Sequence, residues 1–238
     1  MSGHSHWAKI KRSKGANDAK RGRVWSKLAR RIIVAARAGG GNPDENLTLR
    51  YSIEEAREEN MPNDTIDKAV KKGSGELGAV NFDSVLYEGY GPGGVAILAD
   101  ALTDNRNRTA GEIRMIFDKH NGALAGTNAV ARMFLKKGII NVEKSKIEED
   151  KLMELALDAG AEDVVTSEEG YEITTTYQDF EKVRQALQAA KLELAHADLM
   201  MIPAQTVALA GDNAEKLQKI VEGLEANDDV QNVYTNAE

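Results

Sequence analysis

Basic residues dominate the first 37 positions of this 238-residue chain. Eleven lysines and arginines occur there with one acidic residue, Asp18, which gives the segment a net charge of +10. The whole chain carries −7, so the remaining residues sum to −17. A basic segment on an acidic chain is typical of proteins that bind nucleic acid at one end. The candidate phosphate-binding residues are Lys9, Lys11, Arg12, Lys14, Lys20, Arg21, Arg23, Lys27, Arg30, Arg31 and Arg37.

Three further residues are candidates for contact with nucleic acid. Trp7 lies in the basic segment, where its indole could stack on a base, whereas Trp25 falls among apolar positions and is expected in a core. Arg106 and Arg108 lie between a predicted strand and a predicted helix. Two interpretations stay open for them: a simple capped turn, or a pair of phosphate-binding arginines beside a helix N-terminus.

Other kinds of chemistry find little support in the sequence. The chain has no cysteine, which excludes a disulfide, a thiol nucleophile and a cysteine zinc site. His4 and His6 alone do not make a closed metal site, and nothing brings Asp100, Asp104 and Asp118 together. Since no nucleophile, base and orienting group can be combined, we predict a protein without catalytic residues, bound metal, cofactor or small-molecule substrate.

A glycine-rich segment at residues 89–94 matches the dinucleotide-binding pattern G-x-G-x-x-G. In that fold the pattern must open a helix, whose N-terminus holds the pyrophosphate. Here the strand-like run Val95–Leu98 follows instead. The segment is therefore predicted to be a turn between two strands.

The elements that must position the basic residues follow from periodicity. Residues 18–38 predict a helix with a basic face opposite an apolar face, and Gly39 to Gly41 end it. Arg23, Lys27, Arg30 and Arg31 lie off the apolar face, so their replacement is expected to leave the fold intact. A second helix is predicted from a cap at Asn42 to about residue 60, and a third from about residue 62 to 73.

The rest of the chain predicts two α+β domains. Residues 138–203 follow the order β-α-β-β-α-β of a ferredoxin-like unit. A second such set is predicted from strands at 95–102, 129–135, 206–209 and 230–235, with helices at 109–120 and 212–225. The predicted fold class is thus α+β, with an N-terminal three-helix domain and two ferredoxin-like domains, one inserted in the other. The predicted ranges are 1–75, 81–136 with 204–238, and 137–203.

Three separated motifs resemble those of YebC-type proteins. The opening residues 3–11 are similar to the family's G-H-S-K-W-x-x-I-K start, and residues 87–95 and 103–109 are similar to two further signatures. The segments at residues 60–62 and 122–124 also fit, so the resemblance covers essentially the whole chain. His6 departs from the family pattern, which usually has lysine there.

The resemblance implies three domains and a non-enzymatic regulator in the cytoplasm. Bacterial members are generally described as DNA-binding transcriptional regulators. Mitochondrial relatives and some bacterial ones are described as translation factors that act on the ribosome. The expected partner is therefore a nucleic acid, with DNA first and ribosomal RNA, tRNA or the ribosome as the alternative. Relief of stalled peptide synthesis would be the role in that alternative.

The composition favours a globular protein that is not embedded in a membrane. Apolar residues make up 42% of the chain and charged residues 29%, which is ordinary for a globular protein. No run of 18 apolar residues occurs, and no apolar signal segment precedes Trp7. These observations, with the absence of cysteine, favour the cytoplasm.

Overall fold

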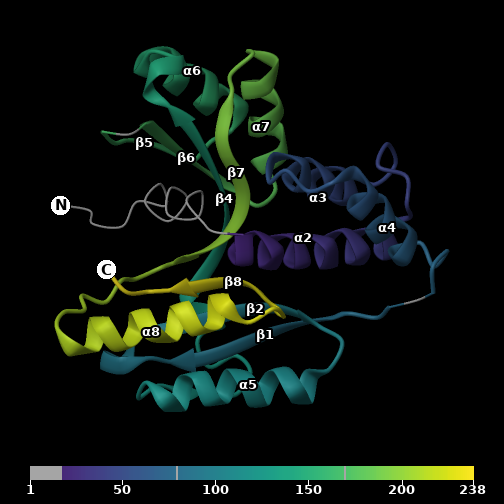
Figure 1. Ribbon diagram of the computed structural model, residues 1–238. Helices are drawn as coiled ribbons and strands as arrows, with labels where there is room; N and C mark the ends of the chain where they lie inside the picture. Colours follow the sequence, from purple (N-terminus) through teal and green to yellow (C-terminus); the bar gives the residue numbers. More distant parts are fainter. Residues whose placement is uncertain (1–17, 79, 169) are drawn as a thin grey trace. The chain divides into compact units, whose positions relative to one another are not determined.

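The computed structural model describes residues 18–78, 80–168 and 170–238. The predicted basic arm, with Trp7, Lys9, Lys11, Arg12 and Lys14, lies outside the described residues. Among the described residues, the chain divides into two compact units. One contains residues 18–131 with 208–237, and the other contains residues 132–207 with Glu238. Figure 1 shows the elements of both units along the chain.

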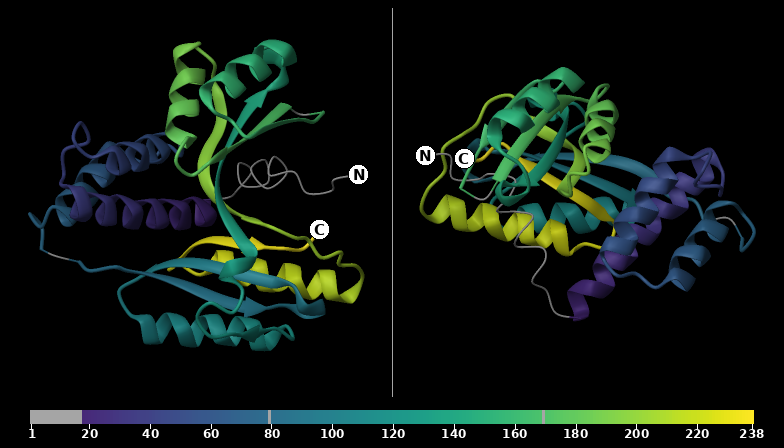
Figure 2. Two further views of the ribbon diagram at one scale, coloured as in Figure 1. Left: turned by 180° about the vertical axis from the view of Figure 1, so that it is seen from behind. Right: turned by 90° about the horizontal axis from the view of Figure 1, so that it is seen from above.

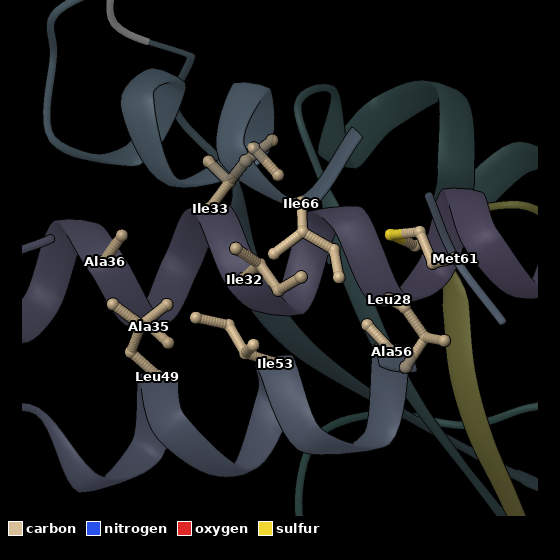
Figure 3. Close-up of a cluster of buried hydrophobic side chains, with 11 residues drawn as sticks. Leu28, Ile32, Ile33, Ala35, Ala36, Leu49, Ile53, Ala56, Met61 and Ile66 are labelled. Carbon is tan, nitrogen blue, oxygen red and sulfur yellow. The ribbon is translucent and has the colours of Figure 1, made fainter. Parts of the chain in front are cut away.

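Three helices form the N-terminal part of the first unit: α2 (Asp18–Gly39), α3 (Leu47–Glu58) and α4 (Asn63–Gly73). They bury one apolar core, to which each helix contributes (Figure 3). Ile32 and Leu49 are fully buried in it, as the apolar stripe of an amphipathic helix predicts. The core residues shown and labelled are Leu28, Ile32, Ile33, Ala35, Ala36, Leu49, Ile53, Ala56, Met61 and Ile66.

The second helix begins later than the sequence predicted. Residues 42–45 form a turn, in which the Asn46 amide donates to the Asn42 carbonyl over 3.0 Å. Asn46 is the N-cap of α3, because its side-chain oxygen accepts from the Leu49 amide at 3.1 Å. The Asn46 side-chain nitrogen also donates to the Ala35 and Gly40 carbonyls, 2.8 Å away in each case. These bonds favour Asn46 over Asn42 as the N-cap of α3. A prediction from the capping residues alone cannot include them, because they join segments that are apart in the sequence.

The first sheet of the structure has the order β3-β1-β2-β8, and all its pairs are antiparallel. Helices α5 and α8 bury Phe117 and Ile220 in its core. Its elements are β1 (Asp83–Tyr90), β2 (Ala96–Thr103), α5 (Arg106–Lys119), β3 (Ala123–Leu124), α8 (Asp212–Ala226) and β8 (Val230–Thr235).

Four strand assignments in this sheet differ from the sequence predictions. The two-residue strand β3 was not predicted. Strand β1 was not predicted, because its buried Glu88 breaks the apolar pattern. Of residues 129–135, the first two form a bend, Ala131–Met133 form a 3₁₀ turn, and the last two begin a strand of the second sheet. Residues 206–209 add no strand to the sheet, and the Leu209 side chain instead packs at the glycine-rich turn beside Gly93. That turn joins β1 to β2, as predicted.

The second unit contains the sheet β5-β6-β4-β7, which has the strand order of a ferredoxin-like fold. Helices α6 and α7 pack Leu152 and Val183 against Ile140 and Ile173 of one sheet face. Figure 2 shows these elements in two further views. The elements are β4 (Phe134–Glu143), α6 (Glu149–Ala159), β5 (Asp163–Thr166), β6 (Gly170–Thr176), α7 (Phe180–Ala189) and β7 (Leu194–Pro203).

These observations confirm the predicted fold class, α+β with an N-terminal helical part and two antiparallel sheets. The three predicted domain ranges, 1–75, 81–136 with 204–238, and 137–203, stay a proposal. Among the described residues, no helix is both long and apolar enough to cross a membrane.

Candidate nucleic-acid interface

The predicted basic face lies on α2, opposite the face that packs into the helical core. Trp25 packs against that core as predicted, and its indole Nε1 donates to the Glu59 carbonyl at 3.0 Å. Lys20 lies in the first turn of α2. Arg21 and Arg37 are exposed, and Arg23 is half-buried.

The middle of the basic face contacts other parts of the same unit. Lys27 Nζ donates to the Glu225 carbonyl at the end of α8 over 2.8 Å. Arg31 donates to both carboxylate oxygens of Glu55, at 2.9 and 2.8 Å, and to the side-chain oxygen of Asn232. Burial, together with the charges of Arg31 and Arg23, lowers the pKa of Lys27 to about 8 although Glu225 acts in the opposite direction.

Asp229 joins Arg30 of α2 to Arg108 of α5. Its side chain is only 4% exposed and lies 3.1 Å from Arg30 Nη1 and 2.7 Å from Arg108 Nη2. The Thr109 hydroxyl also donates to it, at 2.6 Å. Burial raises the pKa of Asp229, but Thr109, Arg108 and Arg30 together outweigh it, so the pKa is lowered. The sequence could not reveal this carboxylate, because it occurs in a short acidic turn far along the chain.

An open pocket of about 820 Å³ brings three of the predicted phosphate-binding residues together. Arg23, Arg30 and Arg108 line it, but so do three acidic residues. Because the two kinds of charge balance, the pocket holds no surplus positive charge for a phosphate. The acidic residues are Glu112, Asp228 and Asp229.

The prediction that exchanging Arg23, Lys27, Arg30 and Arg31 leaves the fold intact needs correction. Lys27, Arg30 and Arg31 each contact a carbonyl, carboxylate or amide of another element. Helical periodicity correctly placed these residues off the apolar face. It does not show which residues of other elements contact the basic face. A charge reversal at these positions would therefore disturb folding together with any phosphate contact.

Arg106 and Arg108 both lie in the first turn of α5. Asn105 caps this helix, since its side chain accepts from the Arg108 amide at 3.1 Å, so a capped turn is present. Arg106 Nε lies 2.8 Å from Asp83, and Arg108 also bonds Asp104 at 2.8 Å. Each guanidinium thus has a carboxylate partner inside the unit.

Glu88 is a second buried carboxylate that the sequence analysis missed. It is 3% exposed and accepts from the amides of Asn128, Val130 and Ala131, at 2.6, 2.8 and 2.7 Å. Burial raises its pKa, but these backbone donors outweigh that effect and the pKa is lowered. Glu88 therefore fixes the exposed loop of residues 126–128, in which Asn128 has φ 65°.

Glu88→Gln is expected to lower the free energy of unfolding by about 3 kcal/mol, since one carboxylate oxygen becomes an amide group that cannot accept. Wild-type Glu88 stabilises the fold fully above its unfolded pKa, near 4.5, and this stabilisation disappears as pH falls through the lower folded pKa. Urea unfolding at pH 7 and pH 3 measures both effects. The exposed loop residue Glu45, changed to Gln, is the control. Equal stabilities of the two variants would contradict the role of Glu88.

No group of three or more histidine, aspartate or glutamate side chains is arranged to hold a metal ion in the part of the chain that the structure describes. His120 is the C-cap of α5, and His196 lies in β7 opposite Asn141. Arg30 of α2 and Arg108 of α5 are arranged for charge pairing with carboxylates.

Two family models match the chain. Residues 5–76 match the TACO1/YebC protein N-terminal domain, and residues 82–237 match the TACO1/YebC second and third domain. The chain is 54% identical to a probable transcriptional regulatory protein of Pelotomaculum thermopropionicum, covering 100% of this chain and 99% of the relative. It is 52% identical to one of Desulfosudis oleivorans, over 100% and 96% of the two chains.

A solved structure is also similar. The crystal structure of a conserved hypothetical protein from Aquifex aeolicus has a TM-score of 0.88 and 44% sequence identity. The match covers 98% of this chain and 97% of that chain. The similarity in fold therefore extends over both units.

Proposed function

Since this chain belongs to the TACO1/YebC family, we propose that it is a DNA-binding regulator of gene expression and that it has no catalytic role. The names of its relatives support a role in transcriptional regulation. The single observation that carries DNA binding is the net charge of +10 over residues 1–37, in a chain whose remainder sums to −17. We propose the cytoplasm as its location.

The basic segment is proposed to supply affinity through phosphate contacts. Exposed arginines at the two ends of α2, Arg21 and Arg37, extend the charge of the preceding residues onto a folded helix. Lysine and arginine contacts to phosphate set position and affinity but carry little sequence information. The acidic remainder is repelled by phosphate, which favours an approach through the N-terminal end.

Titration of the purified protein with fluorescent nucleic acids tests this proposal. The probes are promoter duplexes, random duplexes of equal length and a structured RNA, each at several salt concentrations. Salt-dependent binding to the duplexes that is tighter than binding to the structured RNA is the expected result, because phosphate contacts supply the affinity. Preference for the structured RNA over every duplex would contradict a DNA-binding regulator.

Sedimentation of cell lysate separates DNA from the ribosome as target. The proposal expects the protein to migrate apart from ribosomes in a sucrose gradient. Co-migration with ribosomes that is lost in high salt, together with preference for RNA in the titration, would contradict the DNA proposal in favour of a translation factor.

A further inference from the structure

We propose that a second basic surface, made by the ends of α2 and α4, binds phosphates of the nucleic-acid backbone. This inference rests on the proposed function. This α2–α4 patch consists of Arg37, Lys68, Lys71 and Lys72. All four residues are exposed. None of their side chains has an ion pair or hydrogen bond among the described residues. They contrast with Lys27, Arg30 and Arg31, which contact other elements.

A close helix contact brings the patch together. A Cβ at Gly73 would lie 2.5 Å from the Ile33 carbonyl oxygen and 2.6 Å from Ala36 Cβ, so only glycine lets α4 approach α2 there. Figure 3 shows Ile33 and Ala36 on α2 and Ile66 on α4. Lys71 and Lys72 directly precede Gly73, and Arg37 directly follows Ala36. The last turns of the two helices therefore lie side by side, with Arg37 on one and Lys71 and Lys72 on the other.

The helix dipole explains part of this charge. Basic residues are favoured in the last turn of any helix, because each C-terminus carries about half a negative charge. Two adjacent C-termini amount to about one negative charge, against four cations. Asp64 and Asp67 each lie four residues before a lysine of the patch, Lys68 and Lys71, on the same helix face and about 6 Å away along the axis. The four cations exceed these two carboxylates and the charge of the two C-termini by about one positive charge.

The chemistry of the patch fits a phosphate backbone. Ammonium groups on flexible stems act as point charges that bind phosphate without reading bases. Ser74 and Glu76 directly follow the patch in the chain, and the Ser74 hydroxyl donates to the Glu76 carboxylate at 3.0 Å. The sequence alone did not predict the patch, because the run of basic residues ends at Arg37. Lys68, Lys71 and Lys72 come close to α2 only through the tertiary packing of α4 on α2.

The variant Lys71→Gln with Lys72→Gln tests the inference. Titration with a fluorescent 20-base-pair duplex at several salt concentrations should show about tenfold weaker binding near 0.1 M salt. The slope of log affinity against log salt should decrease by about two. The matched control is Lys144→Gln with Lys182→Gln, which removes two exposed charges from residues 132–207. Thermal unfolding confirms that each variant is folded.

The outcomes separate the two proposals. If wild-type protein binds and the Lys71 and Lys72 variant matches the control in affinity and slope, the patch is not part of the interface. In that case the proposed function stands. If wild-type protein binds no nucleic acid under any condition, both proposals fail. If affinity falls but the salt slope does not, the lysines act through structure and the inference is overturned.

Discussion

Asp229→Ala is expected to lower the free energy of unfolding of the unit that contains α2 by about 3–5 kcal/mol. The substitution removes the carboxylate that lies 3.1 Å from Arg30 and 2.7 Å from Arg108. The Arg30 side chain is only 17% exposed, so the substitution would leave a largely buried positive charge without a carboxylate partner. The Thr109 hydroxyl would also lose its acceptor at 2.6 Å.

Urea unfolding followed by Trp25 fluorescence measures this effect, in a Trp7→Phe background so that α2 alone is reported. Asp228→Ala is the matched control, because Asp228 is the exposed neighbour of Asp229 in the same turn. A surface carboxylate of this kind is expected to change stability by less than about 0.5 kcal/mol. Similar results for the two variants would show that Asp229 does not join α2 to α5.

A double variant distinguishes charge pairing from packing. Adding Arg30→Met to Asp229→Ala removes the buried cation together with its lost partner. Since the cost of breaking a buried pair comes mostly from the charge left behind, partial recovery of stability is expected. Additive losses from the two substitutions would mean that Arg30 and Asp229 stabilise the unit independently.

The second large effect concerns nucleic-acid binding. Changing Lys9, Lys11, Arg12 and Lys14 to Gln is expected to weaken binding by about a hundredfold or more near 0.1 M salt, because four phosphate contacts are lost. These residues lie outside the described part of the chain. Changes at Lys27, Arg30 and Arg31 would be a less direct test, because those residues contact α3, α8 and the residues around β8.

A matched control distinguishes the effect on affinity of where the removed charges lie from the effect of how many are removed. Lys144, Lys151, Lys182 and Lys191 are exposed lysines of residues 132–207, and their replacement by Gln removes the same total charge. This variant is expected to bind like the wild type within a few-fold. Equal weakening of both variants would mean that overall charge, and not the basic segment, determines the affinity.

Local sequence signals predicted much of the fold. Strand β8 begins and ends where the sequence predicted it, and residues 138–203 adopt the predicted order β-α-β-β-α-β, because their apolar periods and flanking turn residues are local. Strand β1 was missed since its interior contains Glu88, whose three amide donors come from residues 128–131. A buried carboxylate looks like a surface residue until its partners are known.

The candidate site was less predictable than the fold. Periodicity identified which side of α2 is basic, but Lys27 contacts a carbonyl 198 residues later in the chain. The pairing of Arg30 and Arg108 by Asp229 likewise depends on tertiary structure. The α2–α4 patch was missed for the same physical reason, since Gly73 brings two separate segments into contact.

The salt dependence of duplex binding, compared between wild type and the variant lacking Lys9, Lys11, Arg12 and Lys14, tests the central claim most directly. We expect a linear fall of log affinity with log salt for the wild type, and a slope smaller by about four for the variant. Identical slopes and affinities for the two proteins would contradict the claim that the basic N-terminal segment binds nucleic acid.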